Sequence, residues 1–262
     1  IVLVTGVQTC ALPIFFSANF FILIVGVLSG FILPVILPIS EYANLRTFTF
    51  YISYIGLLNF GFNDGVYIKY GGKNISDINQ SELKYERDFF ICFQIIITII
   101  FLAVGLILKN IIIILFSISI LPLNSQSFFV LFYQSTGQFK KYANRNYVSS
   151  ILTLVFIVAL ALVLKETKYI YYCIGYVFVY YAMFIYLNIE FSIMSKNIKR
   201  QISIKEIKNI FKVGIFILLG NLSVTLFYAL DRWFVKIFLN NEDFAFYSFA
   251  ISMLTFINVL IN

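Results

Sequence analysis

Residues 89–108 read FFICFQIIITIIFLAVGLIL, a predominantly apolar run without a single charged side chain. A helix that crosses the hydrocarbon core of a bilayer needs about 20 consecutive apolar residues. The run is therefore long enough to span a membrane. Runs of similar length recur from one end of the chain to the other, which predicts an all-α, polytopic transmembrane bundle.

The bulk composition supports the same fold class. The 262 residues are 61% hydrophobic and only 12% charged, with a mean hydropathy of +0.94. Soluble domains average about 45–50% apolar and about 25% charged residues. This chain has too much apolar surface for one aqueous core and too few charges to solvate its outside. We therefore exclude a soluble enzyme.

Two residue types restrict the chemistry further. The chain contains no histidine, so no imidazole can serve as a metal ligand, proton relay or general base. The three cysteines, Cys10, Cys92 and Cys173, show no paired spacing, and no disulfide framework is visible. The sequence predicts no metal site, no cofactor and no catalytic residue.

Charges and Gly, Asn or Pro clusters separate the apolar windows. We predict seven spans and an eighth at the end of the chain, with helices over residues 15–38, 43–62, 89–108, 111–135, 147–164, 169–191, 204–231 and 244–262. The loops after the second, fourth and sixth helices carry thirteen of the 19 lysines and arginines. Basic loops stay on the cytoplasmic side, so these loops and the native N-terminus are expected there. The positive net charge then marks orientation in a membrane, with no nucleic-acid partner.

The two ends of the chain look like cuts. Residues 4–14 read VTGVQTCALPI, break the Ile-, Phe-, Asn- and Lys-rich bias of the rest, and look like a translated sequencing adapter. Residues 1–14 are thus expected to be non-native, and the last apolar run has no closing charge. Ser203 and Glu206 have the spacing of a capping box, which predicts a helix start at Ile204. We expect a six-helix lobe over 15–192, a cytoplasmic linker over 193–203, and two helices of a truncated second lobe over 204–262.

Four stretches resemble one family of membrane transporters. They are ISEYA at 39–43, IGLLNFGFNDGVYIKY at 55–70, QSTGQFKKYA at 134–143, and DRWFV at 231–235 followed by FYSFA at 246–250. In this order and spacing they are similar to polysaccharide flippases, which export O-antigen and capsule repeat units. These flippases belong to the multidrug/oligosaccharidyl-lipid/polysaccharide exporter superfamily. Family members have twelve to fourteen helices, so the chain would supply the first lobe and the beginning of the second.

The resemblance implies a function without covalent chemistry. A flippase of this family moves an undecaprenyl-diphosphate-linked oligosaccharide across the bacterial cytoplasmic membrane for surface polysaccharide synthesis. Its two lobes would alternate around a cavity lined by helices one, two, seven and eight. The lipid-linked oligosaccharide, the bilayer and other polysaccharide-assembly proteins are the implied partners.

Seven charged residues are candidates for contacts with such a substrate. Arg46, Lys69, Lys212, Asp231 and Arg232 are candidates for the substrate cavity, and Lys140 and Lys141 for holding phosphate at the cytoplasmic mouth. Lysine and arginine attract phosphate as cations. Each also has an ordinary interpretation, since Arg and Lys near helix ends reach for headgroups and anchor the helix. We also consider an Arg46–Asp231 ion pair as an outer gate.

Three other functions remain open on the sequence alone. A multidrug or cation antiporter of the same superfamily normally needs carboxylates inside the membrane, and the predicted spans hold only Glu190 and Asp231, both near helix ends. A polysaccharide polymerase usually has a large outer loop, while the outer loops expected here are short. A membrane acyltransferase usually has an intramembrane histidine, which this chain lacks.

Overall fold

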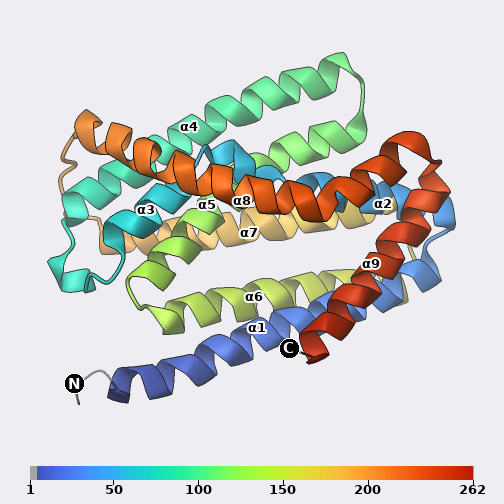
Figure 1. The fold of residues 1–262 in the computed structure, drawn as a ribbon, viewed down its shortest axis with the longest axis horizontal. Coiled ribbons are helices and arrows are strands. Elements are labelled where there is room, and N and C mark those ends of the chain that lie inside the picture. The colour runs from blue at the N-terminus through green and yellow to red at the C-terminus, as the bar shows by residue number, and fades with distance from the viewer. Residues whose placement is uncertain (1–4, 262) are drawn as a thin grey trace. The chain divides into compact units, whose positions relative to one another are not determined.

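The computed structural model describes the backbone of residues 5–261, with the side chains of 5–12, 15, 228 and 255–261 left outside the description. Within this range the chain forms nine α-helices and no strand, which confirms the all-α fold (Figure 1). Val4, the first residue of the adapter-like stretch, lies outside the described residues. The first helix begins at Thr5. The helical conformation of residues 5–14 does not bear on their origin.

Six helices are long and apolar enough to cross a membrane. They are α1 (Thr5–Ile36, apolar from Phe16), α4 (Gln80–Ile107), α5 (Ile111–Ser135), α6 (Phe139–Val158, continued by the π-helical turn η3, Ala159–Val163), α7 (Tyr169–Met194) and α8 (Ile204–Phe238, apolar to Phe227). Outward-facing isoleucines on α4 are strongly exposed, with Ile99 at 60% and Ile107 at 79%. Exposed apolar helix faces of this length are suited to contact with lipid. The chain is therefore a multi-pass membrane protein.

Several helices begin earlier than their apolar windows. α4 starts at Gln80 instead of residue 89, and α6 at Phe139 instead of residue 147. The Asn79 side chain caps α4 by accepting hydrogen bonds from the Ser81 and Glu82 amides. The added turns carry the charged residues that hydropathy places outside a span. By contrast, α8 begins at Ile204 as predicted, and the Glu206 amide donates to the Ser203 hydroxyl at 3.4 Å.

The predicted second span is wrong as a continuous helix. Residues 43–62 divide between α2 (Ile39–Ile52), the 3₁₀ turn η1 (Ile55–Asn59) and the start of α3 (Phe62–Tyr70). Phe60 and Gly61 both adopt left-handed backbone angles, with φ of 52° and 81°. The Asn59 side chain accepts from the Gly61 amide at 2.7 Å and donates to the Gly56 carbonyl at 2.6 Å. These side-chain bonds satisfy backbone groups that a helix would otherwise pair.

The described chain divides into two compact units. The first comprises the residues up to Phe50, Ala143–Val179 and the residues from Thr225. In it α1 contacts α9 (Asn241–Ile261) and η3 (Figure 1). Phe50 of α2 packs edge-on against Trp233 of α8 and Phe244 of α9. These aromatic contacts hold three helices of the unit together.

The second unit comprises Tyr51–Tyr142 and Tyr180–Val224. α5 packs against α4, α3 and η1, and α4 and α5 run side by side (Figure 1). Phe62 is fully buried and stacks on Phe90 of α4, with ring centroids 4.8 Å apart. α8 approaches η1 and α3 so closely that a Cβ on Gly214 would clash with the Gly61 carbonyl oxygen. Only glycine at position 214 allows this backbone contact.

Candidate functional site

A cavity of about 360 Å³ opens within the first unit, between α1, α2, α6, α7 and α9. Its wall combines apolar residues of α1 with hydroxyl, amide and guanidinium groups. The polar wall residues are Ser29, Tyr42, Arg46, Thr49, Arg145, Asn146, Ser149, Ser150, Thr153, Tyr176 and Ser252. Polar groups gathered at one concave site inside a membrane helix bundle mark a pathway or binding site.

Arg46 of α2, one of the candidates for the substrate cavity, lies half-buried in this wall. Its Nε donates to the Tyr42 hydroxyl at 2.7 Å, and its guanidinium lies 5.1 Å from the centre of the Tyr42 ring. Its Nη2 also donates to the Ser252 hydroxyl of α9. None of these contacts neutralises the positive charge. The guanidinium is therefore oriented by neutral partners and keeps its attraction for anions.

The α6 part of the wall carries a second arginine. Arg145 Nη1 donates to the Asn146 side-chain oxygen at 2.9 Å, and both residues line the cavity from α6. Asn146 is only 2% exposed, and its amide nitrogen has no hydrogen-bond partner among the described residues. A buried donor without an acceptor is costly unless a ligand or water supplies one. The α6 wall thus holds spare donor capacity.

A second hollow of about 550 Å³ lies between α1 and the helices that carry Arg232 and Ser252. It shares Gly26, Gly30 and Ser252 with the first cavity, so the two adjoin. Arg232 lines it, and its buried Nε has no hydrogen-bond partner in the described part of the chain. The structure therefore brings Arg46 and Arg232 to adjoining hollows of one unit.

Asp231 lines neither of the two hollows. It is exposed, accepts a hydrogen bond from the Arg232 amide at 2.7 Å, and accepts another from the Tyr247 hydroxyl. The outer-gate hypothesis required Asp231 to pair with Arg46. Among the ion pairs of the described residues this one is not present, and both side chains bind other partners.

The described charged side chains that line the two hollows are all positive. The described lining of the hollows includes Arg46, Arg145 and Arg232, and no aspartate or glutamate. Guanidinium groups bind phosphate and carboxylate through several hydrogen bonds, and hydroxyls and amides bind sugar hydroxyls. The cavity can therefore accept an anionic, hydroxyl-rich ligand. The described Cys, Asp and Glu side chains form no group that could hold a metal ion.

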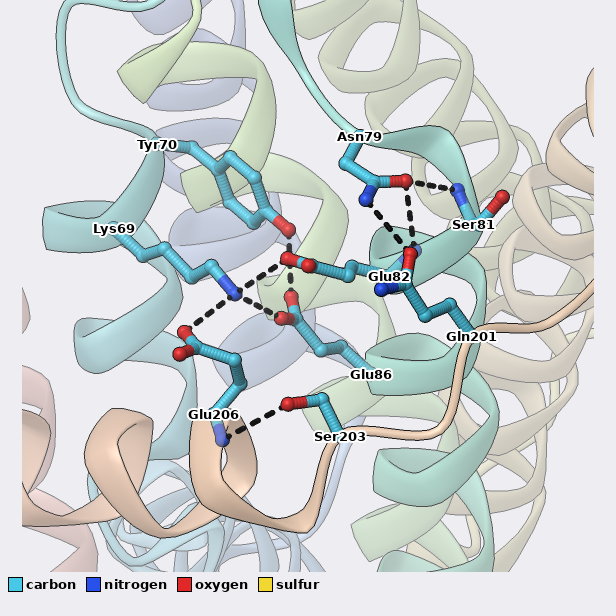
Figure 2. A network of polar contacts seen from close by, with 9 residues as sticks. All are labelled: Lys69, Tyr70, Asn79, Ser81, Glu82, Glu86, Gln201, Ser203 and Glu206. Carbon is cyan, nitrogen blue, oxygen red and sulfur yellow. Dashed lines mark hydrogen bonds and ion pairs between the residues drawn. The ribbon is translucent and has the colours of Figure 1, made fainter.

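Lys69 lies in the second unit, where three carboxylates surround it (Figure 2). Its Nζ lies 2.6 Å from Glu86 Oε1, 3.3 Å from Glu82 Oε2 and 3.0 Å from Glu206 Oε2. The Tyr70 hydroxyl also donates to Glu86, at 2.8 Å. In this arrangement the Lys69 charge is more than balanced by acid, and it links α3 to α4 and α8.

The cluster also sets the protonation of its members on α3, which lies outside the six candidate spans. Burial alone would lower the pKa of Lys69, but the Glu86 and Glu206 carboxylates outweigh it and raise that pKa above its usual value. Burial, together with the negative charge of Glu86, raises the pKa of the Tyr70 hydroxyl. Lys69 therefore stays an ammonium and Tyr70 stays a hydrogen-bond donor.

The remaining lysine candidates, Lys140, Lys141 and Lys212, belong to the second unit. Lys141 pairs with Glu190 at 3.1 Å, whereas Lys140 and Lys212 are exposed. None of the three lines either hollow. The role of Lys140 and Lys141 at a cytoplasmic mouth, and that of Lys212 in a substrate cavity, stay predictions.

In the predicted topology Arg145 is one of the basic residues of the loop after the fourth helix, and Asn146 is not among the candidate residues. A usable signal was present. Asn146, Ser149, Ser150 and Thr153 recur at helical spacing and share one face of an otherwise apolar segment. A polar stripe on a predicted span indicates a cavity-facing side, because lipid does not accept it.

Comparison with known proteins adds nothing to these observations: no family model, curated protein or solved structure matches the chain.

Proposed function

We propose that the chain belongs to a flippase that carries a lipid-linked, anionic oligosaccharide across the bacterial cytoplasmic membrane. The observation that carries the proposal is the cavity with Arg46 and Arg145 in its wall and no carboxylate in its described lining. A diphosphate-linked sugar offers anionic oxygens to the guanidinium groups and hydroxyls to the serine and threonine side chains. The resemblance of four sequence stretches to polysaccharide flippases supports the same substrate class.

In this proposal the substrate binds in the first unit. In the first unit, Arg46, Arg145 and Arg232 attract the diphosphate and the polar wall accepts the sugars. Transport then requires only binding and a change of access, so no covalent step and no cofactor enter the mechanism. We also propose that the native N-terminus lies in the cytoplasm, because the loops after the second, fourth and sixth predicted helices carry thirteen of the 19 lysines and arginines.

A direct test measures ligand binding to the purified 262-residue chain in detergent. The probes are a farnesyl-diphosphate-linked disaccharide and its neutral farnesyl glycoside, titrated by isothermal calorimetry. The diphosphate probe should bind at least tenfold more tightly. Arg46→Gln and Arg145→Gln should each weaken it roughly tenfold, since a hydrogen bond to a charged group contributes about 1.5–3 kcal/mol.

Matched controls separate cavity binding from general electrostatics. Lys168→Gln removes an exposed positive charge outside both hollows, at a residue that is not a candidate for substrate contact, and should leave affinity unchanged. Equal affinity for the charged and neutral probes would overturn the proposal. Preferential binding of rhodamine 6G, a lipophilic cation, would instead favour the multidrug antiporter.

A further inference from the structure

The N-terminal turns of α8 carry two opposite faces in the second unit. On one face Ile207 and Ile210 are 5% and 2% exposed, and Glu206 binds Lys69 of α3. Gly214 on the same face contacts the backbone at Gly61. This side of α8 is fixed against the rest of the unit, so the opposite side must face outward.

The outward face begins with lysines. Lys205, Lys208 and Lys212 follow the i, i+3, i+7 spacing of one helical stripe, and all three are exposed. None of them makes a hydrogen bond or ion pair with any described residue. The nearest acid on the helix, Glu206, is already bound to Lys69. We call these three residues the lysine stripe.

The same face then becomes apolar. Phe216 and Leu219 continue the stripe by one and two turns, and they are 69% and 50% exposed. They lie in the part of α8 that is apolar enough to cross a membrane. A face that changes from lysine to exposed aromatic and aliphatic side chains within one turn matches the step from headgroup to hydrocarbon.

We propose that the lysine stripe together with Phe216 and Leu219 forms a binding site for an anionic phospholipid. The lysines contact the phosphate and the anionic headgroup, and the two apolar side chains contact the acyl chains. The three lysines, which have no partner among the described residues, complement the negative charge of the headgroup. Phe216 and Leu219 continue the same face into the membrane-spanning part of α8, where acyl chains lie. This site shares no residue with the arginine-lined cavity and does not depend on the proposed transport function.

Native mass spectrometry of the purified chain in neutral detergent tests the site. The probes are dioleoyl-phosphatidylglycerol and dioleoyl-phosphatidylcholine, which share acyl chains and differ in net charge. Each basic residue near an anionic headgroup adds to the attraction, so phosphatidylglycerol should bind at least tenfold more tightly. The triple variant Lys205→Gln/Lys208→Gln/Lys212→Gln should lose this preference to within about twofold.

The matched control is Lys109→Gln/Lys165→Gln/Lys168→Gln, which removes three exposed lysines from other helix ends. It changes the net charge equally and should keep the preference for phosphatidylglycerol. Because all six lysines are exposed, both variants are expected to fold, and circular dichroism verifies their helix content.

Three results would overturn the proposal. The first is equal binding of the two lipids to the wild-type chain, as expected if this face is normally covered by protein. The second is an equal loss of affinity in the stripe variant and the control, which would indicate net charge alone. The third is displacement of phosphatidylglycerol by millimolar inorganic phosphate together with no effect of Phe216→Ala, which would indicate a free-anion site.

Discussion

The Lys69 ammonium lies 2.6 Å from Glu86 Oε1, and the Glu86 side chain is only 1% exposed. A buried carboxylate needs a partner, because transfer of a charge out of water is costly without one. Lys69 is itself 15% exposed and also bonds to Glu206. One side chain of α3 therefore holds acids from both α4 and α8.

Replacement of Lys69 should destabilise the chain strongly. Lys69→Gln leaves Glu86 buried without its cation, and loss of one partner of a buried pair costs about 3–5 kcal/mol. Unfolding of the purified chain in SDS, followed by circular dichroism, should show a loss near the lower value, since Lys69 is partly exposed. The control Lys208→Gln, at an exposed lysine, should change the free energy of unfolding by less than about 0.5 kcal/mol.

A double variant tests whether the attraction between Lys69 and Glu86 accounts for the predicted loss of stability. Lys69→Gln/Glu86→Gln removes both members of the pair and should recover part of the stability lost in Lys69→Gln. The contrary result is a double variant that loses as much free energy of unfolding as the two single variants lose together, or more. In that case the Lys69–Glu86 attraction is not the source of the effect.

The same pair predicts a dependence on alkaline pH. The Lys69 pKa is raised above its ordinary 10.5, because Glu86 and Glu206 outweigh the effect of burial. A raised lysine pKa stabilises the folded state fully below the unfolded value, and the contribution disappears as pH rises through the folded value. The difference in melting midpoint between wild type and Lys69→Gln should be constant from pH 7 to 9 and should narrow above about pH 10.5. A difference that narrows between pH 7 and 9 instead would contradict the raised pKa.

Hydropathy and capping signals were sufficient for the helix class and for some boundaries. The start of α8 at Ile204 followed from Ser203 and Glu206, and the structure contains that cap. The second span failed because a window average does not register a local backbone change. Asn59 and Gly61 carried the turn signal, but their apolar neighbours masked it.

The sequence predicted only part of the candidate site, and the reason differs from that for the second span. Arg46 and Arg232 stood out as charges near apolar segments, and both line hollows of the first unit. Lys69 stood out equally, yet its role depends on Glu86 and Glu206, which only tertiary packing brings to it. Charge marks a residue as unusual in a membrane protein, but its partners decide what it does.

Close backbone packing yields a third prediction. A Cβ on Gly214 would clash with the Gly61 carbonyl oxygen and with backbone atoms that cannot move independently. Gly214→Ala should therefore lower the free energy of unfolding by about 2–3 kcal/mol through overpacking. Gly220→Ala is the matched control on the same helix, since nothing lies within 4 Å of its added Cβ. It should be neutral or stabilising by up to about 1 kcal/mol, because alanine favours a helix more than glycine does. Equal effects of the two substitutions would show that α8 does not rest on the Gly61 backbone.

The helix break between α2 and α3 depends on a chain of buried amides. Gln94 of α4 is fully buried and donates to the Leu58 carbonyl at 3.1 Å, which satisfies a group that the break leaves without a helical partner. The Gln94 side-chain oxygen accepts from the Asn124 amide at 2.8 Å, and the Asn124 backbone carbonyl accepts from Asn63 at 3.1 Å. Each of these amides orients the next.

Removal of Gln94 should therefore cost more than one hydrogen bond. Gln94→Leu leaves the Leu58 carbonyl and the Asn124 amide without their partners, and a buried unsatisfied group costs about 1–3 kcal/mol. SDS unfolding should show a loss of at least 2 kcal/mol, and hydrogen–deuterium exchange should rise at residues 58–63. Cys92→Ala is the matched control, because Cys92 is exposed on the same helix. If Gln94→Leu raises exchange no more than Cys92→Ala does, then Asn59 and Gly61 hold the break by themselves and the amide chain is dispensable.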